Sequence, residues 1–452
     1  PLMEGRPGKN TFFFDFPSVL VLIPRAMSRE KVILRRVDRY DPAAVAGVVR
    51  EGIEELGLAP RLKGRVTIKP NVVFAHHKLA PAAYTRAEFL EGLVTALKDK
   101  ASGGMDITVA ERCGSAIPTT RMFRRAGYYR LKKKLGFKLE AIEEAKKVKV
   151  ALSRGTLHHQ IRTARSIVER DFLVYAPKLK TNVLVLGPTT ALKLNIGLLL
   201  DRERMWNHNE RLDEKIVDLL EVGTPDFIAT DGVETCIGGN QLTGEGKHLG
   251  AVILAAHPLA HDVVCSHIFN LDPAGVGYLK LAAERGYGSL RLGDIDLQGD
   301  IALDELQRRT RGWNYWFLRA DELPGNIKAL CGEPYCRGGC HGVFLDWIYM
   351  IKDRKPRLWN NLPEWTVVAG KYKGDVSAKR VWLLGTCTEV EGKISARRKI
   401  RIRGCPPKHK TLVLWMFLKA GILNPMFRLD LVFDGYVFLF FSWLRRLVRG
   451  RL

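Results

Sequence analysis

The sequence predicts an α/β fold: a parallel or mixed sheet covered by helices on both faces, with a smaller cysteine-bearing α/β unit and a C-terminal helical tail. Short apolar stretches alternate with amphipathic ones between residues 31 and 286, a rhythm typical of alternating strands and helices. The 452 residues, 46% of them hydrophobic and 27% charged, suffice for two or three domains. After residue 301, aromatic, basic and glycine-rich segments replace the alternation.

The individual elements follow in order along the chain. Strands are expected at residues 31–37, 65–70, 106–111, 172–176, 227–230 and 248–256, where apolar and β-branched residues cluster. Helices are expected at residues 42–56, 87–101, 120–136, 212–222, 259–270 and 275–286, where apolar residues recur every three or four positions. Beyond residue 301, a helix is expected at 343–353, strands at 365–372 and 380–390, and a turn at 400–409.

This pattern divides the chain into four parts. Residues 1–26 precede Met27, whose following sequence resembles a natural start, so they are expected to be an extension outside the fold. Residues 27–310 form the expected ligand-binding core, residues 311–410 a cysteine-rich unit, and residues 411–452 a basic amphipathic tail. No stretch of 18 residues is free of charge, which argues against a transmembrane helix.

Polar residues follow the expected strands at their carboxyl ends, where ligands bind in open α/β sheets. Lysines gathered there would attract a carboxylate or phosphate, and asparagines would add directional hydrogen bonds. A desolvated lysine has a lowered pKa and can act as a base. The expected catalytic residues are Lys178, Lys180 and Lys193. The expected ligand-binding residues are Lys69, Asn71, Asn182, Asn195 and Asp231. For each lysine alone, a solvated surface charge is the alternative.

Five of the eight cysteines fall between residues 331 and 405. Without a signal peptide, clustered thiols bind metal more often than they form disulfides. Glycines beside the cysteines allow tight turns, and the prolines after Cys405 are frequent beside iron–sulfur ligands. The sequence GCPP also resembles the cluster motif of the small subunits of nickel–iron hydrogenases and respiratory complex I. We expect Cys336, Cys340, Cys387 and Cys405 to bind a [4Fe–4S] cluster, with Cys331 as a spare or alternative ligand; zinc is the alternative metal.

The formal net charge of +24 favours a polyanionic partner. In the tail, aromatic residues precede the arginine-rich end, RRLVRGRL, and such segregation suits a helix lying on an anionic membrane surface. Nucleic acid is not an expected partner, because binding it would require interleaved aromatic and basic residues. Packing of the tail on the core is the alternative. The expected location is the cytoplasm, with peripheral attachment at the inner face of a membrane.

Several segments, in this order, resemble the family catalogued as domain of unknown function 362. They include VTIKPNVV (66–73), LVYAPKLKTN (173–182), TTALKLNIGLL (189–199), IATDGVETCIGG (228–239) and GAVILAAHPLAHDVV (250–264). The resemblance implies an iron–sulfur association and is distantly similar in pattern to the nickel-dependent lactate racemase group. Asn182 stands where the family usually has histidine, which places a histidine-dependent mechanism in doubt.

Together these features predict an iron–sulfur protein that binds a small anionic substrate at a lysine-rich site. It would act as an oxidoreductase or exchange electrons with a protein partner. The alternative is a non-redox binding or scaffold protein with structural zinc. The common phosphate-binding loops and the G-x-S-x-G elbow of esterases do not occur in the sequence.

Overall fold

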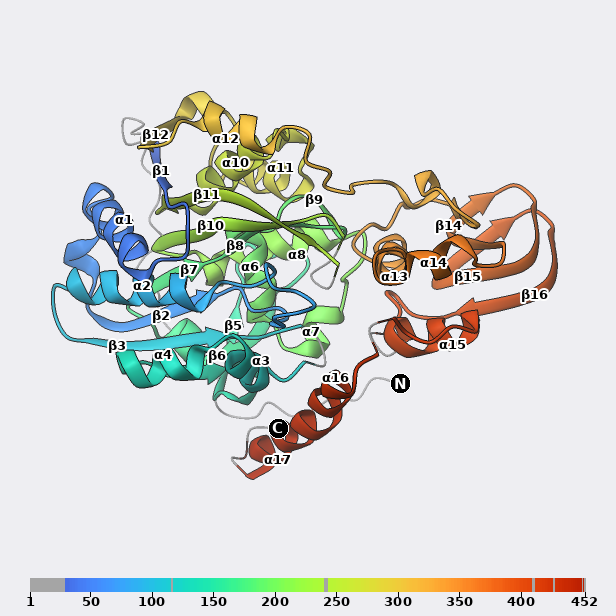
Figure 1. Ribbon diagram of the computed structural model, residues 1–452, viewed down its shortest axis with the longest axis horizontal. Coiled ribbons are helices and arrows are strands. Elements are labelled where there is room, and N and C mark those ends of the chain that lie inside the picture. Colours follow the sequence, from blue (N-terminus) through green and yellow to red (C-terminus); the bar gives the residue numbers. More distant parts are fainter. Residues whose placement is uncertain are drawn as a thin grey trace.

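The computed structural model describes residues 29–114, 117–239, 243–408, 411–425, 427–448 and 450 (Figure 1). The expected extension, residues 1–26, lies outside the described residues. The core contains a ten-stranded sheet whose main path has the order β12 (Ile295–Gly299), β1 (Glu30–Arg36), β11 (Glu245–Ala255), β10 (Phe227–Ile237), β7 (Phe172–Ala176), β2 (Gly64–Pro70), β3 (Met105–Glu111) and β4 (Lys138–Ala141). Off this path, β8 (Lys178–Asn182) pairs with β10 and β9 (Val185–Pro188).

The sheet is mixed, since β11 runs antiparallel to both β1 and β10 whereas the other pairs on the main path are parallel. Helices cover both faces. On one lie α1 (Pro42–Glu55), α2 (Ala87–Asp99), α3 (Thr119–Arg125) and α4 (Tyr128–Leu135). On the other lie α6 (Ala191–Leu194), α8 (Leu212–Asp218), α10 (Pro258–Ile268) and α11 (Gly277–Glu284). The predicted fold class is confirmed.

Alternating side chains of the buried strands explain why both faces are covered. In β1, Val32 and Leu34 pack in the apolar cluster that contains α10, whereas Ile33 packs in the cluster that contains α1 and α2. Successive strand residues point to opposite faces, so an uninterrupted apolar strand needs helices on both sides. The predicted β-α alternation therefore follows from the burial of each strand.

Several predicted elements differ from the structure. The helix expected over residues 120–136 is two helices, α3 and α4, because Gly127 has a left-handed φ of 83° that ends the first. The strand expected to end at residue 230 continues as β10 to Ile237. Residues 400–402, expected in a turn, complete β16 (Ile394–Ile402).

A second, all-parallel sheet lies within residues 311–410, in the order β13 (Ile327–Cys331), β14 (Trp365–Lys373), β15 (Val376–Glu391) and β16. Helix α13 (Cys340–Arg354) packs on it through Trp347, which contacts Trp365 and Trp382. β15 bulges away from β14 between two register pairs, Ala369 with Leu384 and Lys371 with Glu389. In this interval β15 has four residues and β14 has one. This bulge carries Cys387.

The tail has two parts that pack in different places. Helix α15 (Met416–Ala420) packs on the cysteine-bearing unit, where Phe417 contacts Trp347. Helix α16 (Leu429–Phe433), the π-helical segment η8 (Asp434–Phe438) and α17 (Leu439–Val448) run along the edge of the core beside α3 (Figure 1). None of the described helices has the length and apolar character that crossing a membrane requires.

Candidate functional site

The carboxyl ends of β2 and β3 form the floor of the candidate site. Lys69, next to the end of β2, pairs with Glu111, the last residue of β3, at 2.7 Å. Both side chains are buried, and burial lowers the pKa of Lys69 while Glu111 opposes that shift. A Cβ at Gly197 would lie 2.5 Å from the Lys69 Nζ, so glycine is needed above this pair.

A cavity of about 200 Å³ opens above the floor, between the core and the cysteine-bearing unit. Five cationic side chains line it against two acidic ones, Glu111 and Asp346. The cations are Lys69, Lys180, Lys193, Arg112 and Arg204. Asn71 and Asn182 also line the cavity, and Gly338, Pro406 and Pro407 close it from the cysteine-bearing unit. The arrangement has an excess of positive charge in a partly enclosed space, which suits a small anion.

Lys180 and Lys193 lie in this cavity with no carboxylate bonded to them in the described structure. Lys180 donates to the Asn71 Oδ1 at 2.7 Å and to the Ala83 carbonyl at 3.0 Å. Burial lowers the pKa of Lys180 to about 8. Burial, reinforced by the positive charge of Lys180, lowers the pKa of Lys193 to about 7. Near neutral pH Lys193 can therefore hold or release a proton.

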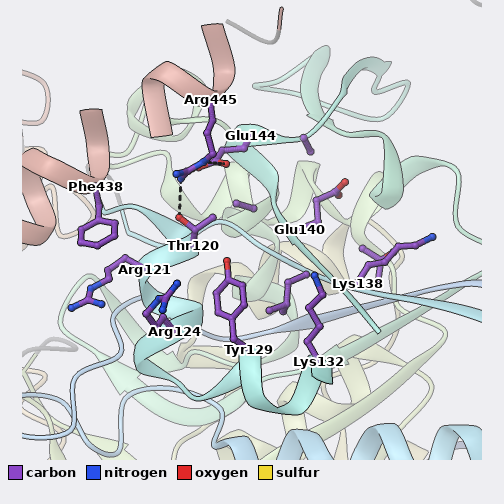
Figure 2. Close-up of a pocket in the computed structure, with 14 residues that line it drawn as sticks. Thr120, Arg121, Arg124, Tyr129, Lys132, Lys138, Glu140, Glu144, Phe438 and Arg445 are labelled. Atoms are coloured by element: carbon purple, nitrogen blue, oxygen red, sulfur yellow. Dashed lines mark hydrogen bonds and ion pairs between the residues drawn. The ribbon is translucent and has the colours of Figure 1, made fainter. Parts of the chain in front are cut away.

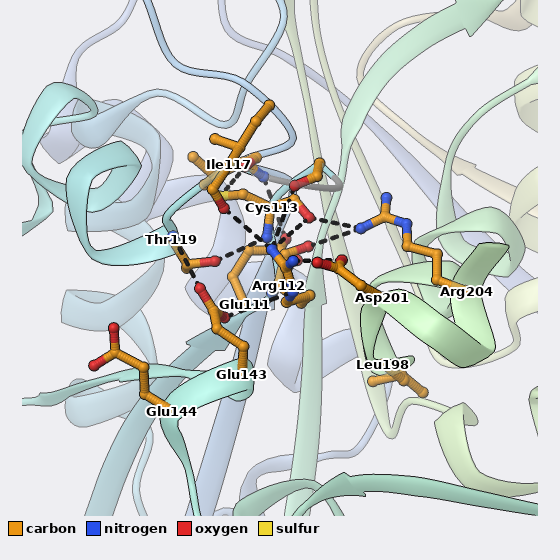
Figure 3. A network of polar contacts seen from close by, with 12 residues as sticks. Glu111, Arg112, Cys113, Ile117, Thr119, Glu143, Glu144, Leu198, Asp201 and Arg204 are labelled. Atoms are coloured by element: carbon orange, nitrogen blue, oxygen red, sulfur yellow. Dashed lines mark hydrogen bonds and ion pairs between the residues drawn. The ribbon is translucent and has the colours of Figure 1, made fainter. Parts of the chain in front are cut away.

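Two arginines that the sequence analysis did not single out complete the cationic wall (Figure 3). Arg112 donates through Nη1 to the carbonyl groups of Cys113, Gly114 and Ile117 and pairs through Nη2 with Asp201. Arg204 donates to the Cys113 carbonyl at 2.6 Å, and burial lowers its pKa. Arg112 thus stabilises the loop after β3. The signal that could have identified Arg112 is its position directly after the strand expected at residues 106–111, in the segment ERCGSA.

Three predicted site residues do not line the cavity. Lys178 forms a buried ion pair with Asp231 at 3.0 Å, and neither side chain is exposed. Asp231 was expected in a loop after its strand, but β10 continues past it, and its Cα is paired in register with that of Lys178 in β8. Asn195 is buried away from the cavity, with its Oδ1 accepting from the Tyr175 hydroxyl. The expectation that these three face a common rim is wrong.

Four of the five clustered cysteines lie close enough together for the charge of one to affect the pKa of another. Cys336, Cys387 and Cys405, when ionised, would add to the raised pKa of Cys340, whose larger cause is burial. Cys405 acts likewise on Cys336, whose pKa burial raises to about 12. Cys331 lies elsewhere, at the end of β13, where the charges acting on its pKa are those of Asp321 and Arg319. Among the described residues, no three His, Cys, Asp or Glu side chains group closely enough to hold a single metal ion.

Two glycines leave room for the sulfurs of this group. A Cβ at Gly339 would lie 2.6 Å from the Cys336 Sγ, and a Cβ at Gly385 would lie 2.6 Å from the Cys340 Sγ. Without a cation the thiols of Cys336, Cys340 and Cys387 are protonated, because burial and the charges of neighbouring groups raise their pKa values. A bound metal centre reverses this, since coordination deprotonates a thiol. Thiolates are the donors that an iron–sulfur or zinc centre uses, although in the described structure no three of these donors surround one point.

A short loop of the core joins the cavity to the cysteines. His208 lines the cavity and its Nδ1 lies 2.8 Å from the Gly338 carbonyl oxygen. Burial lowers the pKa of His208 to about 3, so its ring is neutral at physiological pH. Asn209 donates to the Cys405 Sγ at 3.6 Å, and Cys336 donates to Glu210 at 3.5 Å. Nothing in the sequence indicated that Asn209 and Glu210 would meet cysteines about 200 and about 130 positions away.

Comparisons with known proteins agree with the resemblance seen in the sequence. Residues 66–267 match the family model described as Domain of unknown function (DUF362). A thylakoid-associated protein of Synechocystis sp. is 25% identical over 256 residues, which cover 55% of this chain and 77% of that protein. The lactate racemase apoprotein from Thermoanaerobacterium thermosaccharolyticum aligns with 76% of this chain and 70% of its own, at 11% identity and a TM-score of 0.35. Residues 66–267, which match the family model, include three lysines that line the cavity, Lys69, Lys180 and Lys193.

Proposed function

We propose that this chain, which carries a DUF362 domain over residues 66–267, binds a small carboxylate or phosphate in the cavity beside a thiolate-bound [4Fe–4S] cluster. The observation that carries the proposal is one cavity with cations from the core on one side and Gly338, Pro406 and Pro407 of the cysteine-bearing unit on the other. These three residues adjoin the cysteines, so the ligand would lie next to the metal centre.

The cations of the cavity have different roles in this proposal. Lys69 is paired with Glu111, and Arg112 with Asp201, so both mainly stabilise the walls. Lys180 and Lys193 remain to bind the anion, and Asn71 orients Lys180 through its Oδ1. Val343, Met350 and Leu412 line the rest of the cavity, and their apolar surroundings strengthen each charge interaction.

Proton transfer is the step that the chain itself supplies. With a pKa of about 7, Lys193 can accept a proton from a bound ligand or return one near neutral pH. Cys336, Cys340, Cys387 and Cys405 would hold the cluster, which supplies one-electron transfer when bound. The N–H group that Asn209 directs at the Cys405 sulfur would tune such a centre, because hydrogen bonds to sulfur shift reduction potentials.

Two measurements on the anaerobically purified chain test the proposal. A broad absorption near roughly 400 nm that bleaches with dithionite supports thiolate-bound iron. A colourless protein with stoichiometric zinc supports the non-redox alternative instead. For the ligand site, calorimetric titration with oxalate should detect binding that Lys180→Ala and Lys193→Ala each weaken by about tenfold or more, the loss of one charge-assisted hydrogen bond.

The matched control is Lys379→Ala, which removes an exposed lysine of β15 far from the cavity lining. Oxalate affinity should stay unchanged in this variant. If wild-type chain and both cavity variants bind oxalate equally, or none binds it, the cavity is not an anion site.

A further inference from the structure

A second cavity lies between the core and the tail, and its lining shares no residue with that of the candidate functional site. It has a volume of about 520 Å³ and is lined by α3, α4, β4 and the turn η2 (Ile142–Glu144) on the core side and by Phe438 and Arg445 of the tail. In Figure 2, Tyr129 and Lys132 extend from α4 on one side, and Arg445 reaches Thr120 and Glu144 from α17 on the other. We refer to it as the tail cleft.

The tail cleft carries five cations against two carboxylates. The cations are Arg121, Arg124, Lys132, Lys138 and Arg445, and the carboxylates are Glu140 and Glu144. Arg445 pairs with Glu144, Arg121 with Asp434, and Lys138 with Asp106. Arg124 contacts the face of the Tyr129 ring and Lys132 is exposed, so two cations remain for a ligand. Lys133 and Lys134 extend the positive surface along α4.

The tail that borders this cleft turns its apolar side outward. Thirteen of the fifteen exposed large hydrophobic residues in the described structure fall between residues 414 and 448, and only Leu186 and Trp206 lie elsewhere. In α17 they include Phe440, Phe441 and Trp443. The polar groups of the tail face the core: Asp434 pairs with Arg121 and Arg125, and Arg445 with Glu144. The segment from α16 to α17 is thus amphipathic and held in place by ion pairs, and its apolar side chains are exposed in the described part of the chain.

We propose that this face docks on an anionic lipid bilayer, with the aromatic edge of α17 entering the headgroup–acyl boundary and the tail cleft binding a lipid phosphate. An apolar helical face beside a basic surface is the combination that binds such interfaces. The net charge of +24 complements an anionic leaflet. A second copy of the chain fits this face poorly, because pairing two tails would bring two cationic clefts together.

Vesicle flotation with the full chain tests the proposal. Vesicles of phosphatidylglycerol and phosphatidylcholine should carry the protein to the top of the gradient, and vesicles of pure phosphatidylcholine should not. The variant Phe440→Ser/Phe441→Ser/Trp443→Ser should lose binding by tenfold or more. The variant Arg124→Ala/Lys132→Ala/Lys133→Ala should lose roughly 100-fold, since each cation near an anionic surface contributes about fivefold.

Two matched variants keep the test specific. Leu186→Ser removes an exposed apolar side chain elsewhere, and Lys379→Ala/Arg397→Ala/Lys399→Ala removes three exposed cations from β15 and β16. Both should float like the wild type, and circular dichroism should show every variant folded. The proposal is overturned if the wild type does not float, if it floats equally with neutral vesicles, or if the tail variants float unchanged. A wild-type dimer that the tail variants convert to monomer would assign this face to a second copy.

Discussion

At the scale of single residues, the lowered pKa values of Lys193 and Lys180 predict how the site responds to pH. In the free protein these pKa values are about 7 and about 8, so both lysines lose their charge as the pH rises from 6 to 9. Oxalate stays doubly ionised over this range, so its affinity should fall with rising pH. Calorimetry at several pH values measures this, and Lys193→Met should remove the step at the lower pH. An affinity that does not change with pH would contradict the assignment.

The same residue also predicts a dependence of stability on pH. The folded pKa of Lys193 lies below its ordinary value of 10.5, so the unfolded chain binds more protons between about pH 7 and 10.5. Lys193 therefore destabilises the fold at neutral pH, and this cost disappears as the pH rises through that window. Lys193→Met should raise the free energy of unfolding at pH 7 by about 1–3 kcal/mol, allowing for the partial exposure of the lysine, and by much less at pH 10. Urea denaturation at the two pH values measures the difference.

Gly385 sets the position of one predicted metal ligand. It has a φ of 106°, and a Cβ there would lie 2.6 Å from the Cys340 Sγ. Gly385→Ala should displace this sulfur and lower the metal content of the purified chain. Gly374→Ala is the matched control, because Gly374 has a similar φ of 126° but the nearest atom to its Cβ, in Tyr372, would be 3.7 Å away. Equal metal content in the two variants would mean that backbone strain, and not the thiol, is what Gly385 relieves.

At the scale of elements, the pairing of β8 with β10 depends on the buried ion pair of Lys178 and Asp231. Asp231 also accepts hydrogen bonds from the Tyr40 hydroxyl at 2.9 Å and from the backbone N–H of Arg86 at 3.1 Å. Neither donor carries a formal charge, so Lys178 is the group that neutralises the buried carboxylate. Lys178→Met should destabilise the chain by roughly 3–5 kcal/mol because it leaves a carboxylate buried and unpaired. Lys138→Met, which breaks the exposed pair with Asp106, should cost about 1 kcal/mol or less. Comparable losses for the two variants would contradict a structural role for Lys178.

The elements show which parts of the fold the sequence could predict. β7 is predictable because it is a continuous apolar run, which is typical of a central strand buried on both faces, and β1 is predictable from its apolar centre, Val32–Leu34. The division of α3 from α4 could not be predicted from periodicity, because the helical spacing continues across Gly127 and only the backbone conformation there ends the helix. Asp231 was misplaced for a related reason: Gly232 after it suggests a turn, yet β10 continues because β8 and β11 pair with it on both sides.

At the scale of the whole molecule, the candidate site forms where two units meet. Lys69 and Lys180 were predictable because carboxyl ends of strands share one edge of a sheet. Lys193 lies in α6, and its short distance in sequence from Lys180 indicated the same place. Asn209 and Glu210 were not, because they meet the cysteines only through the docking of one loop on the cysteine-bearing unit. Arg204 was not either, because its contact with the Cys113 carbonyl joins positions of the core that are far apart in the sequence. No local pattern in a sequence encodes such a contact. The core alone therefore brings the lysines together, whereas the cavity forms only when the cysteine-bearing unit packs against the core.

We propose that Cys336, Cys340, Cys387 and Cys405 together hold one iron–sulfur cluster beside the cationic cavity, while Cys331 takes no part. Iron and acid-labile sulfide, measured on anaerobically purified chain, test it most directly. We predict about four irons and four sulfides per chain for the wild type and for Cys331→Ser, and a loss of most of both in Cys340→Ser. Stoichiometric zinc without iron, or a loss of iron in Cys331→Ser as large as that in Cys340→Ser, would contradict the claim.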